Sequence, residues 1–559
     1  MTAATFKDTA SRRPSWLSAL PDTSSTTWLY ALVALLAGLH LNMVLGRAVN
    51  WDEFWFYSQV EILGRGEFVK PLQTIHTRFF YWWLPDLPGS EIDKIIVARG
   101  FMFLCLMVIA GGIYAMAERF SDHRTALLAV ALYLGAGFVV HHGTSFRVDP
   151  IVTAFLTTGL AIATRTRLTA PAILALGVMI AFAAMVTIKF VLWFPAFAGI
   201  ALWRWHDEKW DWRYPLRWIA AGAVALGVFA LLYVWHGMDM AGQSANDEAA
   251  RTLGRSSGKM FGLFHSPYIF IMAKGAVTAI PFTLAMLLVP SMALRAPQPP
   301  LRKLALLLLW VPILTPFFYH NSAPYIYTFL LPPVVVSCAL TIPLFVKRYN
   351  HAFVAAIIAL TTLAIWSVDE RGVTERQQEL VAAVHEVFPE PVSYFDCCGM
   401  VGTFTKSNNF LTTWGIEIYR NSGRPLLLET MQAKPVPLLL DNGIFFTPVF
   451  EGGELGAIHP DDAVAVGNTF IRFWGDIYVA GRELEAGDAM QWDVLVPGTY
   501  TVEGSLSVQG RELADGELIT LGRGAVTLSN TGDATARLVW GSNPKRPSYA
   551  PSEEYWTGF

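Results

Sequence analysis

Two adjacent carboxylates, Asp52 and Glu53, follow the first long apolar run of the chain, which covers about residues 28–46. Aromatic side chains surround them, from Trp51 to Tyr57. A carboxylate pair at a membrane boundary costs free energy unless a partner, a metal ion or a reaction uses it. We expect Asp52 to act as a general base and Glu53 to orient it or bind an acceptor. The structural alternative is a helix cap or an arginine partner.

A polar cluster at residues 141–150 leads into another apolar run. Within it, Arg147 is a candidate phosphate ligand. Asp149 could contact a bound sugar, fix Arg147 or cap the helix, and Pro150 suits a first helical turn. The alternative is a capping box with an interfacial arginine.

Other cationic side chains are expected on the same side of the membrane as candidate phosphate ligands: His76, Arg78, Lys189, His265 and Lys274. Lys189 has wholly apolar flanks, so its charge must snorkel to water or meet an anion. Snorkelling is the simpler explanation. Lys274 falls inside an expected span, where snorkelling explains it less well.

A polar and aromatic turn at residues 319–327 offers further ligands. Its His320, Asn321, Tyr325 and Tyr327 could bind a sugar or acceptor through amide, imidazole, hydroxyl and aromatic groups. An interfacial aromatic belt would place tyrosines here too.

The composition predicts a polytopic α-helical membrane protein. Hydrophobic residues make up 53% of the 559 positions, and the mean hydropathy is +0.41. From residue 369 onward there are 26 acidic and 13 basic side chains, against 18 and 28 before it, so an acidic tail follows a basic membrane part. Eleven spans are expected, at about 28–46, 95–117, 125–141, 150–164, 170–186, 189–203, 217–235, 267–293, 303–319, 325–346 and 351–367.

Basic residues in alternate connectors place the N-terminus in the cytoplasm. These residues include Lys7, Arg12, Arg13, Arg119, Arg124, Arg165, Arg167, Arg204, Lys209, Arg213, Arg217, Arg295, Arg302, Lys303, Lys347 and Arg348. An odd number of spans then puts Asp52 and the tail on the outer face. The first span lacks the features of a cleavable signal and is expected to be an uncleaved anchor.

We divide the chain into a cytoplasmic segment at 1–27, a transmembrane module at 28–368, a periplasmic α/β region at 369–490 and a β-rich region at 491–559. In the outer loop 47–94, amphipathic segments at Trp51–Leu63 and Thr74–Trp83 should lie in the membrane interface. The loop at 236–266 is a mobile lid or a solvated connector.

The tail should begin with a helix at about 369–387. Strands are expected at Val392–Phe395, Pro437–Leu440, Phe445–Val449 and Thr469–Phe473, and a small β-sandwich from Trp492 to Gly541.

Three features together resemble a known family: the acidic pair, the Arg-x-Asp-Pro at 147–150, and the Pro-Tyr-Ile-Tyr-x-x-x-Leu-Pro-Pro run at 324–333. They are similar to polyprenyl-phosphate-dependent glycosyltransferases of the GT-C fold, in particular protein O-mannosyltransferases and lipid A aminoarabinose transferases. The resemblance covers about residues 28–367. It implies inverting transfer from a lipid-phosphate-linked sugar, with Asp52 as base and Arg147 as phosphate contact. The tail does not match the repeat domain of the O-mannosyltransferases.

The expected partners are a polyprenyl-phosphate-linked sugar donor, an envelope lipid, glycan or protein as acceptor, and membrane lipids, with no nucleic acid. The expected location is the inner membrane of a bacterium. No metal is expected to be essential, although Asp52 and Glu53 could hold a divalent cation together with substrate phosphate. Two other functions stay open: a transporter or lipid flippase, and a non-catalytic protein of envelope polysaccharide assembly.

Overall fold

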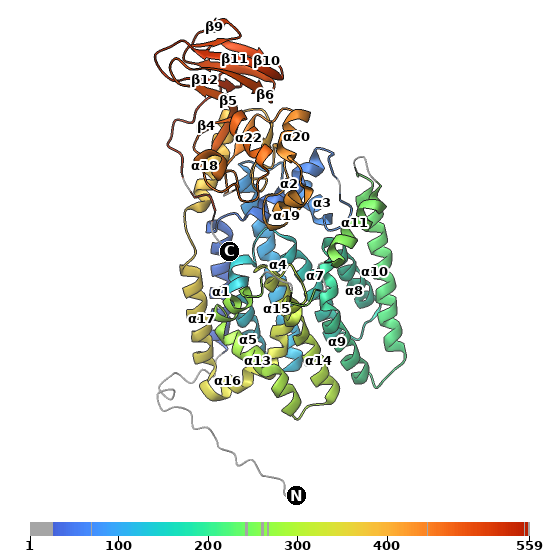
Figure 1. The fold of residues 1–559 in the computed structure, drawn as a ribbon. Coiled ribbons are helices and arrows are strands. Elements are labelled where there is room, and N and C mark those ends of the chain that lie inside the picture. The colour runs from blue at the N-terminus through green and yellow to red at the C-terminus, as the bar shows by residue number, and fades with distance from the viewer. Residues whose placement is uncertain are drawn as a thin grey trace. The chain divides into compact units, whose positions relative to one another are not determined.

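The computed structural model describes residues 26–559 apart from 69, 241–243, 259–261, 265–267, 444, 553 and 557–559. The chain divides into two compact units. The helical unit comprises Met1–Leu45, Gly66–Phe80 and Ile96–Asp369. The mixed unit comprises Gly46–Arg65, Tyr81–Ile95 and Glu370–Phe559, and in Figure 1 all labelled strands belong to its orange and red part.

The helical unit is built from apolar helices joined by short connectors. Proline stands in the first or second position of α8, α9, α13, α14 and α16, where its missing N–H costs no hydrogen bond. The helices are α1 (Thr27–Gly46), α3 (Ile75–Tyr81), α4 (Glu91–Phe120, which starts in the mixed unit), α5 (His123–Leu134), α6 (Gly137–His142), α7 (Val148–Arg165), α8 (Ala170–Val186), η2 (Ile188–Trp193), α9 (Phe194–Asp207), α10 (Arg213–Gly237), α11 (Ala245–Gly258), α12 (Ile271–Val277), α13 (Ile280–Arg295), α14 (Pro300–Trp310), η3 (Val311–Phe317), α15 (Ile326–Ser337), η4 (Cys338–Leu340), α16 (Ile342–Tyr349) and α17 (His351–Ser367).

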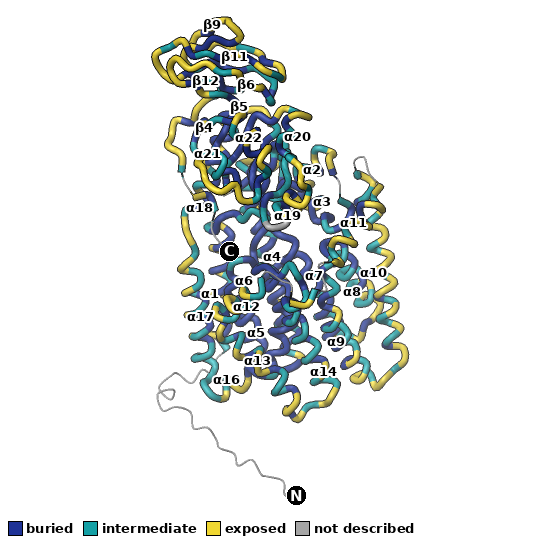
Figure 2. Tube along the Cα trace, viewed as in Figure 1, coloured by how far each residue is buried: buried dark blue, intermediate teal, exposed yellow. Residues whose placement is uncertain are grey.

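Each of the eleven expected spans contains at least one helix. Among the described residues, four helices are long and apolar enough to cross a membrane alone, and two bent pairs bring the number to six. The chain is therefore a multi-pass membrane protein, and the count of eleven stays a prediction. Helix α15 is buried along its whole length, whereas Figure 2 shows α10 mostly in the colours of intermediate and exposed residues.

Two of the expected spans are bent. The axes of α12 and α13 differ by 107°, and those of α15–η4 and α16 by 54°. Pro281 and Pro343 stand in the first turns of α13 and α16, where proline cannot donate a hydrogen bond back to a preceding turn. The loop at 236–266, expected to be either a lid or a solvated connector, contains a helix of its own, α11.

The mixed unit holds two sheets. The larger has the strand order β10-β7-β12-β5-β3-β1-β2, with β4 also paired to β5, and the smaller has the order β6-β11-β8-β9. Strand β1 is parallel to both β2 and β3, and the other pairs are antiparallel. The elements are α2 (Trp51–Gly64), α18 (Val373–Val387), β1 (Ser393–Phe395), β2 (Thr405–Lys406), α19 (Thr413–Ser422), α20 (Leu426–Ala433), β3 (Leu438–Leu440), α21 (Thr447–Glu451), α22 (Pro460–Thr469), β4 (Phe470–Trp474), β5 (Ile477–Leu484), β6 (Ala489–Val494), β7 (Gly498–Glu503), β8 (Leu506–Val508), β9 (Arg511–Leu513), β10 (Leu518–Leu521), β11 (Gly524–Asn530) and β12 (Ala536–Trp540).

Strand β5 belongs to both halves of this unit. Its first residues, Ile477–Val479, pair with β3, and its last residues, Gly481–Leu484, pair with β12. Tyr478 and Ala480 pack in the core of the α/β region, whereas Leu484 packs in the core of the β-rich region. The two regions expected on either side of residue 490 are therefore joined by a shared strand.

Two expectations differ from the structure. The segment Phe445–Val449 is not a strand: α21 begins within it at Thr447, because Pro448 in its first turn cannot donate to a sheet and favours a helix start. The outer loop 47–94 is not wholly part of the transmembrane module. Residues 46–65, which include α2, and residues 81–95 pack with the tail instead.

Candidate functional site

The acidic pair lies in the first turn of α2. Asn50 caps this helix: its side-chain oxygen accepts a hydrogen bond from the Asp52 N–H at 2.9 Å. The Glu53 carboxylate accepts one from the Asn50 N–H at 3.0 Å, which completes a capping box. Glu53 is buried at 1% exposure, and Asp52 is half-buried. The cap expected as an alternative is therefore the structural role of Glu53, which also fixes the backbone that carries Asp52.

A second cluster gathers charged residues within the helical unit. The Lys189 ammonium forms an ion pair with one Asp149 oxygen, and Arg147 Nε lies 3.4 Å from the other. All three residues are buried, at 5% exposure for Arg147, 1% for Asp149 and 8% for Lys189. Buried charges of this kind persist only where partners or a ligand compensate their desolvation. We name these three residues the cation cluster; it holds two positive charges and one negative charge.

Local structure brings the cation cluster together. Arg147 is the N-cap residue of α7, and Asp149 lies in the first turn of that helix, where a carboxylate is favoured by the helix dipole. Lys189 lies in η2, where the Thr187 hydroxyl accepts from its N–H. Snorkelling, the simpler sequence interpretation of Lys189, is wrong because its ammonium is buried against Asp149. Arg147 and Asp149 lie together as expected.

Tyr325 adds an aromatic face to the cation cluster. Arg147 Cζ lies 3.5 Å from the centre of the Tyr325 ring, and Lys189 Nζ lies 5.7 Å from it. Both distances fit cation–π interactions. The 319–327 turn, singled out for sugar binding, thus supplies one residue that contacts both cations.

The other residues of that turn differ in their surroundings. Asn321 and His320 are half-buried, and the Asn321 side-chain oxygen has no hydrogen-bond partner among the described residues. Tyr327 is buried against Phe138 instead, with ring centres 5.1 Å apart.

Tyr327 borders an apolar cavity of about 280 Å³. The bend between α12 and α13 lines this cavity with Gly275, Ala279 and Phe282, and α6 contributes Phe138. Its walls are almost entirely hydrocarbon, so it suits an apolar chain rather than a sugar.

Arg78 is held by residues at the end of α10. Arg78 Nε donates to His236 Nδ1 at 2.8 Å, and Arg78 also pairs with Asp239 at 2.5 Å and lies over the Trp235 ring. These contacts attach Arg78 to the end of α10. Burial lowers the pKa of His76 to about 4, which favours the neutral imidazole near pH 7 over the cation expected from the sequence.

Lys274 is exposed on the short helix α12, before the 107° bend, rather than inside a straight span as expected. His265 lies outside the described residues.

Arg99 is a buried cation that sequence reasoning missed. It lies in α4 at 2% exposure, and its guanidinium donates to the Val44 carbonyl at 3.4 Å. A signal was present, because Arg99 is the only charged residue of the apolar run 95–117. Among the described residues there is no group of three or more His, Cys, Asp or Glu side chains arranged to hold a metal ion.

Comparison with solved structures identifies the fold. The structure of ArnT from Cupriavidus metallidurans bound to undecaprenyl phosphate superposes with a TM-score of 0.54 at 12% identity, over 82% of this chain and 98% of ArnT. The chain has the GT-C fold. The apo structure of the same ArnT gives a TM-score of 0.51 at 12% identity, over 81% of this chain and 98% of ArnT.

An archaeal oligosaccharyltransferase from Archaeoglobus fulgidus, also of the GT-C fold, gives a TM-score of 0.48 at 10% identity, over 76% of this chain and 70% of its own. No protein-family model matches the sequence, and no curated protein matches it significantly. The likeness to ArnT confirms the GT-C fold expected from the sequence.

Proposed function

We propose that this protein is an inverting glycosyltransferase that moves a hexosyl or pentosyl group from a polyprenyl-phosphate donor to an envelope lipid, glycan or protein. The reaction is proposed for the outer face of a bacterial inner membrane. The observation that carries the proposal is the buried cation cluster under Tyr325, in a chain of the GT-C fold. The similar ArnT structure contains undecaprenyl phosphate.

The proposed step balances as a single displacement. An acceptor hydroxyl oxygen forms a bond to the anomeric carbon while the bond from that carbon to the phosphate oxygen breaks. Asp52 takes the hydroxyl proton, and the polyprenyl phosphate leaves with the bonding electrons. Arg147 and Lys189 stabilise the charge that develops on the departing phosphate. No metal ion enters this step, although Asp52 could share a divalent cation with the substrate.

Replacing the proposed base tests this function. Asp52→Asn should reduce transfer at least about 100-fold, because the amide cannot accept the proton. The substrate is the polyprenyl-phosphate-sugar fraction extracted from cells that lack the gene, added to protein in nanodiscs. Release of polyprenyl phosphate is followed by mass spectrometry. Unchanged release by a folded Asp52→Asn protein would eliminate Asp52 as the base.

The donor and acceptor need a separate measurement. Lipids and glycans from cells with and without the gene are compared by mass spectrometry, and loss of one sugar increment identifies the product. An unchanged envelope would favour another function.

A transporter or lipid flippase remains the second candidate, because the 107° bend between α12 and α13 is a broken helix of the kind that lines transport sites. Lys274 lies beside this bend. A flippase would move a fluorescent polyprenyl phosphate across proteoliposomes without transferring sugar, whereas the glycosyltransferase would transfer sugar and lose that activity with Asp52→Asn. A non-catalytic assembly protein would show neither activity.

A further inference from the structure

A buried amide holds the backbone just before the acidic pair. Gln377, on α18, accepts from the Val49 N–H through Oε1 at 2.8 Å. Its Nε2 donates to the Val49 carbonyl at 2.8 Å. The Gln377 side chain thus pairs with both backbone polar groups of Val49. Val49 lies three positions before Asp52.

Gln377 is fully buried, at 0% exposure, on the face of α18 that also buries Val373, Leu380 and Val384. A polar side chain in such a stripe is costly unless its groups are paired. The second hydrogen of Nε2 meets that requirement, since it donates to the Tyr555 carbonyl at 2.8 Å. A carboxylate at this position would lack the donors, and asparagine would be one methylene shorter.

Trp556, which follows Tyr555, supports the same end of α2. The Trp556 ring lies 6.2 Å from that of Trp51 and packs edge-on against Phe54 at 5.6 Å. Trp51 directly precedes Asp52. Trp51 thus contacts Trp556, and the Val49 backbone is bonded to Gln377. Together these contacts restrict the position of the first turn of α2.

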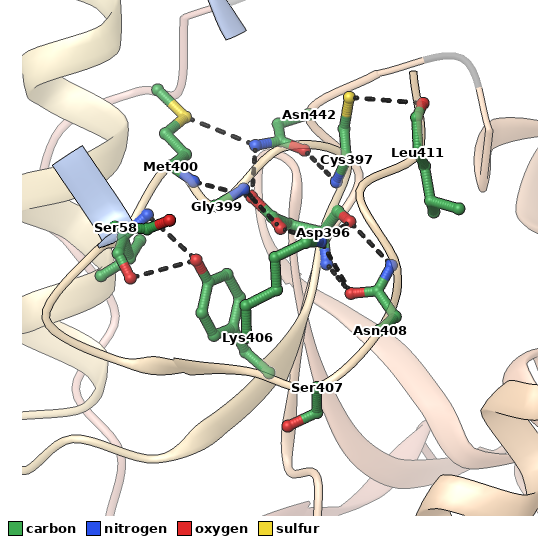
Figure 3. A network of polar contacts seen from close by, with 12 residues as sticks. Ser58, Asp396, Cys397, Gly399, Met400, Lys406, Ser407, Asn408, Leu411 and Asn442 are labelled. Carbon is green, nitrogen blue, oxygen red and sulfur yellow. Dashed lines mark hydrogen bonds and ion pairs between the residues drawn. The ribbon is translucent and has the colours of Figure 1, made fainter. Parts of the chain in front are cut away.

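The far side of α2 rests on the loop between β1 and β2. Arg65 donates to the Gly402 carbonyl at 3.2 Å, and a Cβ on Gly402 would lie 2.7 Å from the Tyr57 ring, so only glycine allows this approach. The loop is itself organised by the buried Asp396. Figure 3 shows Asp396 accepting from the Gly399 and Met400 N–H groups, each at 2.9 Å, and from Lys406 at 2.7 Å.

We propose that Gln377 is a positioning residue for Asp52, so that the C-terminal part of the chain sets the place of the catalytic base. This inference rests on the proposed function, in which Asp52 takes the acceptor proton. General-base catalysis requires hydrogen-bond reach, and a displacement of about 1 Å can cost about 100-fold in rate. Through its three hydrogen bonds Gln377 fixes the backbone from which Asp52 extends.

The test measures kcat and donor binding separately. Gln377→Met keeps the length of the side chain and removes its three hydrogen bonds. It should lower kcat about 10- to 100-fold and leave the Kd for undecaprenyl phosphate unchanged. Gln378→Met is the matched control: Gln378 is adjacent on α18 and bonds Asp93 instead, at 2.7 Å. Its kcat should equal that of the parent.

A second variant tests the positioning role independently, in case Gln377→Met does not fold. Trp556→Leu removes the ring contact with Trp51 without touching the buried amide, and should lower kcat in the same direction. In an Asp52→Glu background, Gln377→Met should cost less than in the parent, because both changes act on one group.

The outcomes separate the two proposals. If Asp52→Asn abolishes transfer but folded Gln377→Met and Trp556→Leu keep the parent kcat, the positioning role is wrong and the function stands. If Asp52→Asn leaves transfer unchanged, the proposed base fails and the positioning role fails with it. Equal loss of kcat and donor affinity in both variants would indicate a general structural role and also overturn the inference.

Discussion

The side chains of the cation cluster have the charge and hydrogen-bonding groups that suit a phosphate. Two buried cations share the Asp149 carboxylate, and Tyr325 covers both. Arginine and lysine suit phosphate differently: the guanidinium offers a planar fork, and the ammonium is a compact point charge. A phosphate headgroup would thus meet two distinct donors.

Substitutions in the cation cluster should weaken binding of the lipid phosphate without weakening binding of the lipid chain. Arg147→Gln and Lys189→Met should each raise the Kd for undecaprenyl phosphate about 10- to 100-fold, because each removes a charge-assisted hydrogen bond. Binding to protein in nanodiscs is measured by native mass spectrometry.

Undecaprenol, which lacks the phosphate, should bind the variants as it binds the parent. Arg165→Gln serves as a matched control, because Arg165 lies at the other end of α7 and pairs with Glu118 at 3.0 Å. Equal binding of undecaprenyl phosphate by the Arg147→Gln and Arg165→Gln proteins would contradict the assignment.

A second residue-scale prediction concerns pH. The hydrogen bond from His385 to the Glu91 carboxylate raises the pKa of His385, against the opposing effect of burial. A raised pKa in the folded state means that protonation stabilises the fold. That stabilisation is fully present below the unfolded pKa of about 6.5 and is lost as pH rises through the higher folded value.

His385→Gln should therefore lower the melting temperature of the protein most near pH 5.5, and progressively less as the pH rises above neutrality. Thermal unfolding of both proteins across pH 5.5–8.5 measures this difference. In a Glu91→Gln background the pH dependence of the difference should disappear. A constant difference at all pH values would show that the pair does not titrate as described.

At the scale of elements, the order of helices was predictable and their bends were not. Apolar runs mark helices whatever their direction, so each of the eleven expected spans contains helical structure. The break at Ala279 depends on Pro281 and on packing around Gly275, which hydropathy does not record. Similarly, the apolar content of Phe445–Val449 favoured a strand, but Pro448 begins α21.

The candidate site was predictable where neighbouring residues act together. Arg147 and Asp149 are two positions apart, and their contact follows from the start of α7. The pairing of Asp149 with Lys189 crosses 40 positions and could not be read from spacing. The neutrality of His76 arises from burial, which its own sequence neighbours do not reveal.

The attachment of α2 is a further element that the sequence did not place. Its amphipathic, aromatic composition predicted an interfacial helix of the transmembrane module. In the structure the same aromatic residues pack within the mixed unit, as Trp55 does against Phe410 at 5.3 Å between ring centres. An aromatic surface suits a headgroup layer and a protein core equally well, so composition alone could not decide.

At the scale of the molecule, the shared strand β5 predicts how the tail tolerates truncation. Removing residues 491–559 deletes β12, which pairs with β5, and also Tyr555 and Trp556, which contact Gln377 and α2. We expect the shortened tail to lose its fold rather than survive as an intact α/β region.

Limited proteolysis of the purified proteins measures this. The full chain should resist cleavage within residues 369–490, whereas the truncated chain should be cut there at many sites. A protease-resistant fragment ending near residue 490 would instead show that the α/β region is independent.

The passage of β5 through two hydrophobic cores also limits how this protein can be rebuilt. A chimaera that takes its β-rich portion from another protein would have to cut a strand whose halves serve different partners, so a workable junction lies before Ile477 rather than at residue 490. Replacing the tail with that of another protein should therefore succeed only when the cores of the α/β region and of the β-rich region both come from the same protein.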